Sequence, residues 1–113
     1  MLSCDKIEGE MSMKKGEEIS DKEFKLKFDN FNDSRCPEGV NCITDGFVQV
    51  EMTATDRTNQ VDSSFVFISN DPAKTSVSIF GYQIDYSDFT PYPKEGVSVS
   101  ESEYRLILAL KKL

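Results

Sequence analysis

The chain of 113 residues has the length of one domain, and its 38% apolar content suffices for one modest core. Its net charge is −7, and no cluster of Lys and Arg interleaves with aromatic residues, so nucleic acid is not an expected partner. The absence of histidine excludes the Ser-His-Asp and Cys-His catalytic arrangements and the histidine-containing zinc sites.

Residues 1–20 mix charged residues with Gly, Ser and Met without a period, which predicts an N-terminal tether or linker before a single domain over 21–113. The first four residues, Met-Leu-Ser-Cys, are similar to the end of a bacterial lipobox, whose cysteine is lipidated, and here that cysteine is Cys4. No apolar stretch precedes them, so this interpretation requires a signal peptide that is incomplete in the sequence. The alternative is an ordinary frayed terminus.

Apolar residues alternate with polar or charged ones over residues 23–28 and again over 47–54, which is the pattern of half-buried strands. Residues 64–68, Ser-Phe-Val-Phe-Ile, carry apolar residues on both faces and predict a central strand. Residues 76–80 and 82–89 predict two further short strands. The residues predicted to face the core in the first two segments are Phe24, Leu26, Phe28, Val48, Val50, Met52 and Ala54.

Turn signals separate these segments, at residues 45–46, 70–72 and 91–96 and at Gly81. Short strands interrupted this often indicate an antiparallel architecture rather than βαβ units. We therefore expect an all-β protein, an antiparallel β-sandwich of about seven short strands.

The last segment, residues 100–113, carries two conflicting patterns. Ser100 and Glu103 have the spacing of a capping box ahead of good helix formers, which indicates a helix. From Tyr104 to Leu110 large apolar residues occupy every second position, which indicates a strand. The pattern by itself favours neither.

Cys36 and Cys42 are separated by five residues that include Pro37 and Gly39, which turn the chain and let the two cysteines approach each other. A redox-active pair normally has two intervening residues and a helix start beside it. A metal site would need further ligands, which only the distant Cys4 and oxygen groups could supply. The spacing therefore favours a structural disulfide, with a redox pair, a metal site and free thiols as the alternatives.

Residues 28–52, 89–96 and 104–112 resemble a family of small secreted lipoproteins of unknown function from Bacteroidota. The specific part of the resemblance is Asp-Ser-Arg-Cys-Pro at residues 33–37, with a second cysteine six residues after the first and a later Pro-Tyr-Pro before a final strand. The chain departs from the family at Thr44, where the family usually has Trp.

The resemblance implies that the last segment is a strand, that Cys36 and Cys42 form a disulfide in an oxidising compartment, and that Cys4 is lipidated. Residues 5–10 are similar to the surface-export signals of some of these lipoproteins. The protein would then be anchored by lipid in the cell envelope, at the outer membrane or the cell surface. The resemblance carries no activity with it.

Three residues are candidates for ligand contact. Asp33 and Arg35 precede the first cysteine, and they could either pair with each other to order the loop or contact a ligand. Tyr92, in the Pro-Tyr-Pro connection, is expected at the surface, where it could contact a sugar or a peptide.

Asp29, Asn30, Asn32 and Asp33 concentrate oxygen ligands of the kind that calcium prefers. The string lacks the glycine and the distal glutamate of an EF-hand loop, and oxygen-rich turns are common between strands. We therefore expect no cofactor, with calcium as the alternative.

These observations predict a non-enzymatic binding or structural module of the bacterial cell envelope, with an unknown protein or glycan as its ligand. One alternative is a module like a protease inhibitor, which requires an exposed, extended loop at Arg35. The other is a carboxylate-based hydrolase, which requires two acidic side chains, for example Asp85 and Asp88, that converge in a cleft.

Overall fold

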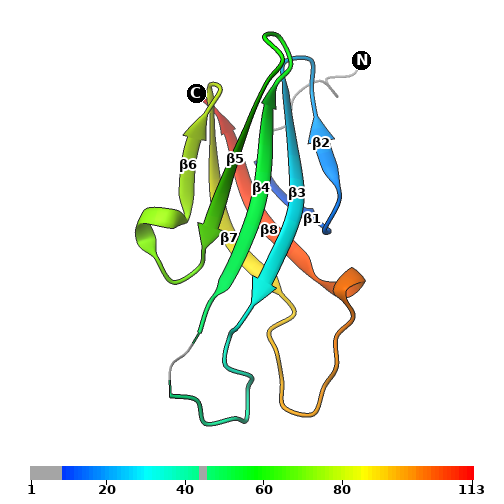
Figure 1. Cartoon of the computed structure of the whole chain (residues 1–113), viewed down its shortest axis with the longest axis vertical. Helices are drawn as coiled ribbons and strands as arrows, with labels where there is room; N and C mark the ends of the chain where they lie inside the picture. The colour runs from blue at the N-terminus through cyan, green and yellow to red at the C-terminus, as the bar shows by residue number, and fades with distance from the viewer. Residues whose placement is uncertain (1–8, 44–45) are drawn as a thin grey trace.

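The computed structural model of the chain describes residues 9–43 and 46–113 and consists almost entirely of strands and their connections (Figure 1). In chain order the elements are β1 (Gly9–Met13), β2 (Glu18–Ser20), β3 (Phe24–Asp33), β4 (Val48–Asp56), β5 (Val61–Ile68), the 3-10 helix η1 (Pro72–Lys74), β6 (Ser76–Ile79), β7 (Tyr82–Thr90), the 3-10 helix η2 (Glu101–Glu103) and β8 (Arg105–Lys112).

The strands form two antiparallel sheets that pack face to face as a sandwich. One sheet has the strand order β1-β8-β7-β6, and the other has the order β2-β3-β4-β5. The predicted all-β sandwich is confirmed, and the described residues contain eight strands rather than about seven.

The alternating segments supply the core between the two sheets. Side chains of successive strand residues point to opposite faces, so every second residue is buried in β3 up to Phe28, in β4 up to Ala54 and in β8 up to Leu110. Among the described residues no polar or charged side chain is buried there. The buried residues are Met13, Phe24, Leu26, Phe28, Val48, Val50, Met52, Ala54, Phe67, Tyr82, Ile84, Phe89, Leu106, Leu108 and Leu110.

The predicted tether over residues 1–20 is wrong for its second half. Residues 9–13 form β1, which pairs with β8, and residues 18–20 form β2, which pairs with β3. Met13 is only 1% exposed and belongs to the core. The sequence pattern is too short to predict these strands, because each contributes only one or two apolar residues and is stabilised by a partner strand elsewhere in the chain. Residues 1–8, with Cys4, lie outside the described residues.

The prediction that residues 64–68 form a central strand is also wrong. They belong to β5, which lies at the edge of its sheet beside β4 (Figure 1). Phe67 is buried, but Phe65, Val66 and Ile68 are only half-buried. An apolar run on both faces therefore marks an edge strand here, where the side of the sandwich is open.

Both patterns in the last segment are real. Ser100 and Glu103 form a capping box around η2, where the hydroxyl of Ser100 donates to Glu103 Oε1 at 3.0 Å. The alternation that follows forms β8, which lies between β1 and β7 and buries Leu106, Leu108 and Leu110. The strand implied by the family resemblance is thus confirmed for residues 105–112.

The two longest connections, residues 34–47 and 91–104, lie together at one end of the sandwich (Figure 1). We call this end the loop end. The short turns between β4 and β5 and between β6 and β7 lie at the opposite end, as does the C-terminal Leu113. The molecule extends 48 Å along its longest axis and 29 and 20 Å across it.

Candidate functional site

The side chain of Arg35 links the two connections that form the loop end. Its Nε and Nη2 atoms donate to the two carboxylate oxygens of Asp33, each at 2.8 Å, and its backbone N–H donates to the same carboxylate at 3.1 Å. Its Nη1 donates to the carbonyl of Phe89 at 2.7 Å, and its Nη2 to the carbonyl of Pro91 at 2.9 Å. Both charged side chains are only 9% exposed, so they form a partly buried ion pair that bridges β3 and the end of β7.

Aromatic rings enclose the same guanidinium. Its central carbon lies 4.8 Å from the ring centroid of Tyr92 and 5.5 Å from that of Phe89, both within the range of a cation–π contact. Burial lowers the pKa of Arg35, but the hydrogen bonds and the charge of Asp33 outweigh it and raise that pKa above its ordinary value. Arg35 is therefore a permanently charged cross-link.

Two β-bulges orient the side chains that surround Arg35. The register of β3 against β4 shifts between Phe28 and Asn30, and that of β7 against β8 shifts between Tyr86 and Asp88. Each extra residue inverts the alternation of the strand, so that Phe31 and Asp33 on β3, and Phe89 on β7, turn toward the inside. Without these bulges the same side chains would face solvent.

A cluster of aromatic rings packs next to Arg35. The ring of Phe89 stacks on that of Tyr104, with the two ring centroids 5.2 Å apart, and its centroid lies 4.9 Å from that of Phe31. The ring of Phe31 also lies 5.1 Å from that of Tyr104. The three rings come from β3, β7 and the residue before β8, so they join both sheets below the loop end.

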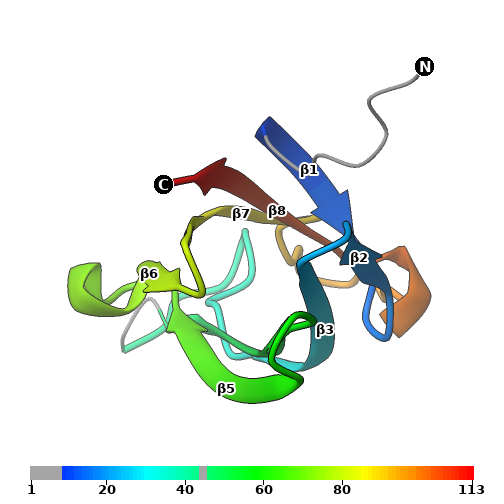
Figure 2. The same ribbon diagram turned by 90° about the horizontal axis from the view of Figure 1, so that it is seen from above.

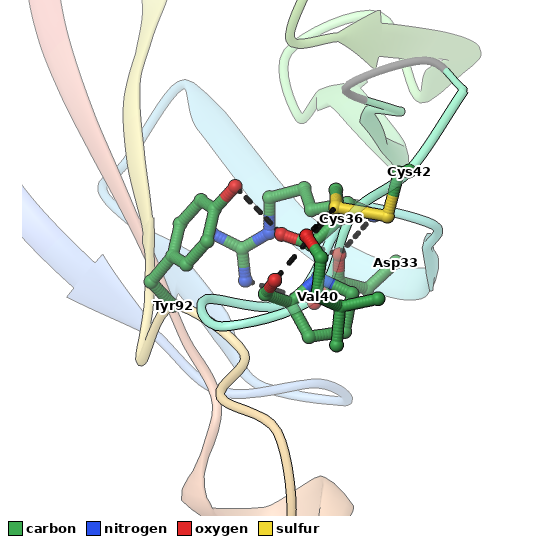
Figure 3. The surroundings of a disulfide bond; sticks show 7 residues. Asp33, Cys36, Val40, Cys42 and Tyr92 are labelled. Carbon is green, nitrogen blue, oxygen red and sulfur yellow. Dashed lines mark hydrogen bonds and ion pairs between the residues drawn. A yellow bond between two sulfur atoms is a disulfide. The ribbon is translucent and has the colours of Figure 1, made fainter.

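A disulfide closes the first connection. Cys36 and Cys42 are bonded, with their Cα atoms 5.9 Å apart, as the spacing and the family resemblance predict (Figure 3). Tyr92 donates its hydroxyl to the carbonyl of Cys36 at 2.9 Å. The departure from the family at Thr44 lies outside the described residues.

The two connections also pair with each other through their backbones. The N–H of Glu38 donates to the carbonyl of Pro93 at 2.8 Å, and the N–H of Glu95 donates to the carbonyl of Glu38 at 2.9 Å. At the base of the first connection, Gly46 has a φ of +70°, and a Cβ there would lie 1.9 Å from the carbonyl oxygen of Ser34. Only glycine fits this position, so the backbone at Gly46 can pass this close to Ser34 just before β4.

The loop end exposes four apolar side chains among charged ones such as Glu38, Lys94 and Glu95. Tyr92 and Val97, from the second connection, are 49% and 58% exposed, and from the first connection Val40 is 40% exposed and Ile43 completely exposed. Ile43 directly follows the disulfide-bonded Cys42, so the cross-link holds an aliphatic side chain out in solvent. The loop end thus combines a cross-linked backbone with exposed apolar side chains.

The three candidate contact residues have different surroundings. Asp33 and Arg35 face each other and the interior, as in the loop-ordering interpretation. Tyr92 is exposed as predicted, although one face of its ring covers Arg35 and its hydroxyl is used by Cys36. The carbonyl groups of Phe89 and Pro91, which complete the arrangement, carry no sequence signal.

The four oxygen-bearing residues considered for calcium do not share one side of the chain. Both carboxylate oxygens of Asp33 accept from Arg35, and Asp29 accepts from the hydroxyl of Thr53 at 2.6 Å. Asn30 and Asn32 are exposed on the outer face of β3. Over residues 9–43 and 46–113 no group of three or more His, Cys, Asp and Glu residues could hold a metal ion.

Asp85 and Asp88 are engaged separately. Asp85 accepts from the hydroxyl of Ser76 at 2.5 Å, and Asp88 accepts from the backbone N–H of Phe89 at 2.7 Å. Surface depressions lined by carboxylates do occur on the outer face of the other sheet, one with Asp29 and Glu51 and another with Glu18, Asp29 and Asp62.

No helix in the described part of the chain is long and apolar enough to cross a membrane. Comparison with known protein families, with curated proteins and with solved structures gives no match to this chain. The resemblance to envelope lipoproteins therefore stays a prediction.

Proposed function

We propose that this protein is a non-enzymatic binding module of the bacterial cell envelope, anchored through lipid on Cys4, and that it binds a protein ligand with its loop end. The observation that carries the proposal is the combination of exposed apolar side chains with a backbone fixed by the disulfide, by Arg35 and by the pairing of Glu38 with the second connection.

Rigidity supports a binding role because a loop that is already ordered loses little conformational entropy when it binds. Isolated exposed apolar residues are common on proteins, but here they gather on two connections that are joined to each other. The absence of histidine from the chain argues against acid–base catalysis at this end.

A protein ligand is favoured over a glycan. Sugar-binding platforms rely on free aromatic faces and on polar side chains, whereas three of the four exposed apolar residues, Val40, Ile43 and Val97, are aliphatic. The one aromatic residue, Tyr92, already covers Arg35 with its ring.

The direction of the chain fits an anchor at its N-terminal side. Gly9, the first described residue, pairs with Leu110 toward the end that also contains Leu113, whereas β8 begins at Arg105 near the loop end. A lipid on Cys4 would therefore leave the loop end directed away from the membrane.

Neither alternative is favoured by the geometry. An inhibitor-like module needs a free Arg35 side chain, but this side chain is 9% exposed and bound to Asp33. A carboxylate-based hydrolase needs a paired acid and base, and Asp85 and Asp88 are bonded to other groups.

The test is site-specific photo-crosslinking in the envelope of the native host, with the crosslinking residue at position 43. Leu113, an exposed aliphatic residue at the opposite end of the sandwich and 66% exposed, is the matched control position. We expect a discrete protein adduct from position 43 and none from position 113, and at least about tenfold weaker binding of that protein to Ile43→Ser than to Leu113→Ser. Equal adducts, or equal affinity of the two variants, would contradict the proposal.

A further inference from the structure

Strand β5 gives its sheet a long unpaired edge. It has eight residues, whereas the other three edge strands, β1, β2 and β6, have five, three and four. Natural edge strands are commonly kept short or are interrupted by Pro, Lys or a bulge. β5 contains neither Pro nor Lys, and its register against β4 has no shift.

The pairing of β5 with β4 determines which N–H and C=O groups of β5 point toward β4 and which point away from the sheet. The N–H of Ser69 donates to the carbonyl of Val48 at 3.0 Å, so in the continuing register residues 61, 63, 65 and 67 bond to β4. Residues 62, 64 and 66 then direct their N–H and C=O groups away from the sheet. The carbonyl of Ile68, which has the same direction, accepts from the N–H of Asp71 at 3.1 Å.

The outward groups of residues 62, 64 and 66 have no partner strand in the described part of the chain, because β4 is the only neighbour of β5 there. Half-buried apolar side chains flank the same edge, namely Phe65 and Val66 from β5 and Val77 and Ile79 from β6. β5 and β6 lie next to each other at this side of the sandwich (Figure 2).

Charge is low at this edge. Asp62 is the one charged residue in β5, and β6 has none, although the chain as a whole carries −7. Depletion of charged residues beside exposed apolar ones is typical of the centre of a protein interface.

We propose that a second copy of this chain pairs with this edge, β5 antiparallel to β5, so that two four-stranded sheets become one sheet of eight strands. The outward groups are self-complementary in one register. When Ser64 lies opposite Ser64 of the second copy, residue 62 lies opposite residue 66, and all the outward groups of residues 62, 64 and 66 find partners. Asp62 then lies opposite Val66 and not opposite Asp62, so the charge of the strand does not face itself.

This dimer uses the side of the sandwich and not the loop end, so it stands independently of the proposed ligand. One strand pair with its flanking side chains covers less area than a standard interface. The association should therefore be weak, with a dissociation constant between roughly 1 µM and 1 mM.

The first test is sedimentation velocity of the full chain across that concentration range, with Ser64→Pro and Ser64→Thr as the variants. Proline removes the outward N–H of position 64 and leaves the bonds to β4 in place, whereas threonine keeps the N–H. We expect the wild type and Ser64→Thr to dimerise alike and Ser64→Pro to dimerise at least tenfold more weakly. A monomeric wild type, or equal dimerisation of the proline variant, would overturn the proposal.

If Ser64→Pro does not fold, a second pair of variants tests the pairing of β5 with β5. Val66→Lys puts a cation opposite Asp62 of the second copy, and Val66→Asp puts an anion there. We expect Val66→Lys to dimerise several-fold more tightly than Val66→Asp, and the ratio to approach one at about 1 M salt, where charges are screened beyond about 3 Å. Equal dimerisation at low salt would rule out this register and with it the proposed pairing.

Discussion

The guanidinium of Arg35 donates four hydrogen bonds, two to the carboxylate of Asp33 and one each to the carbonyls of Phe89 and Pro91. Lysine offers a single nitrogen and cannot make the bidentate pair and reach both carbonyls at once. The carbonyl of Phe89 belongs to β7 and that of Pro91 to the second connection, so the loss of these hydrogen bonds would leave polar groups of both segments without partners.

We expect Arg35→Ala to lower the free energy of unfolding by about 3 kcal/mol, because it leaves the partly buried Asp33 without its counter-charge. Arg35→Lys should lower the free energy of unfolding by about half as much, since lysine keeps the charge but not the bidentate hydrogen bonds. Denaturant unfolding measures both, with the exposed Arg57→Lys as the control, expected within about 0.5 kcal/mol of the wild type. An Arg35→Lys variant as stable as that control would contradict the bridging role.

Tyr86 lies half-buried on β7 near this site, and its titration can be observed directly. Burial raises its pKa to about 12, against the opposing effect of Arg35 and with a smaller contribution from Asp88. In the unfolded chain the pKa of tyrosine is about 10. The folded state therefore holds this proton longer, and its stability should fall as the pH rises from about 10 through about 12.

The measurement is the near-ultraviolet absorbance of tyrosinate during an alkaline titration. The chain has four tyrosines, so the titration of Tyr86 is obtained as the difference between the wild type and Tyr86→Phe. We expect this difference to have its midpoint at about pH 12. A midpoint at about 10, the value of an unfolded tyrosine, would show that Tyr86 is not shielded.

At the scale of elements, β1 decides where the folded domain begins. Its pairing with β8 makes β8 a central strand, and Met13 at its end is buried in the core. Lys14 follows directly and is exposed. The same short segment thus contains a core position and a surface position next to each other.

We expect Met13→Ala to lower the free energy of unfolding by roughly 2 to 4 kcal/mol, the range for a truncated core methionine. Lys14→Ala should stay within about 0.5 kcal/mol of the wild type. Thermal or denaturant unfolding separates the two. If both variants matched the wild type, residues 9–13 would be a tether after all.

The disulfide is the other element with a measurable contribution. Closing the seven-residue loop from Cys36 to Cys42 should stabilise the fold by about 2 kcal/mol, by reducing the entropy of the unfolded chain. The double variant Cys36→Ser/Cys42→Ser should lose this amount in denaturant unfolding. Reductant should destabilise the wild type equally and leave the double variant unchanged, and an equal effect on both would contradict the assignment.

At the scale of the whole molecule, Asp21 ties the two sheets at the end opposite the loops. Its carboxylate accepts from the hydroxyl of Tyr82 on β7 at 2.6 Å and from the N–H groups of Glu23 and Phe24, each at 2.8 Å. Burial acts to raise the pKa of Asp21, but these hydrogen bonds together with the charge of Lys112 bring it below its ordinary value. The sandwich is therefore connected by polar contacts at both ends, through Arg35 and through Asp21.

A lowered pKa means that the unfolded chain binds more protons than the folded one between the two values, so stability rises with pH in that window. We expect the contribution of Asp21 to be complete above pH 3.8, its ordinary pKa, and to be lost as the pH falls toward the lower folded value. Asp21→Asn should cost about 1 kcal/mol at neutral pH and progressively less in acid. Urea unfolding at several pH values measures this, and a cost independent of pH would contradict it.

Much of the architecture could be predicted from the sequence, because it depends on local alternation. The inward residues of β3 and β4 are predicted correctly, since a half-buried strand repeats every two residues whatever its partner is. The disulfide could also be predicted, because five residues with Pro37 and Gly39 allow little else than a tight turn between its cysteines. The sequence left open whether Arg35 pairs with Asp33 or contacts a ligand, and the structure shows the pair.

The sequence by itself determined the all-β class, the two strongly alternating strands and the position of the loop that the disulfide closes. Only the tertiary structure decided that β5 lies at an edge, that β1 belongs to the domain, and that two bulges turn Asp33 and Phe89 toward Arg35. The physical reason is the same in each case. Strand order, edge pairing and the register across a bulge depend on hydrogen bonds between residues far apart in the chain, which a local pattern of apolar residues does not record.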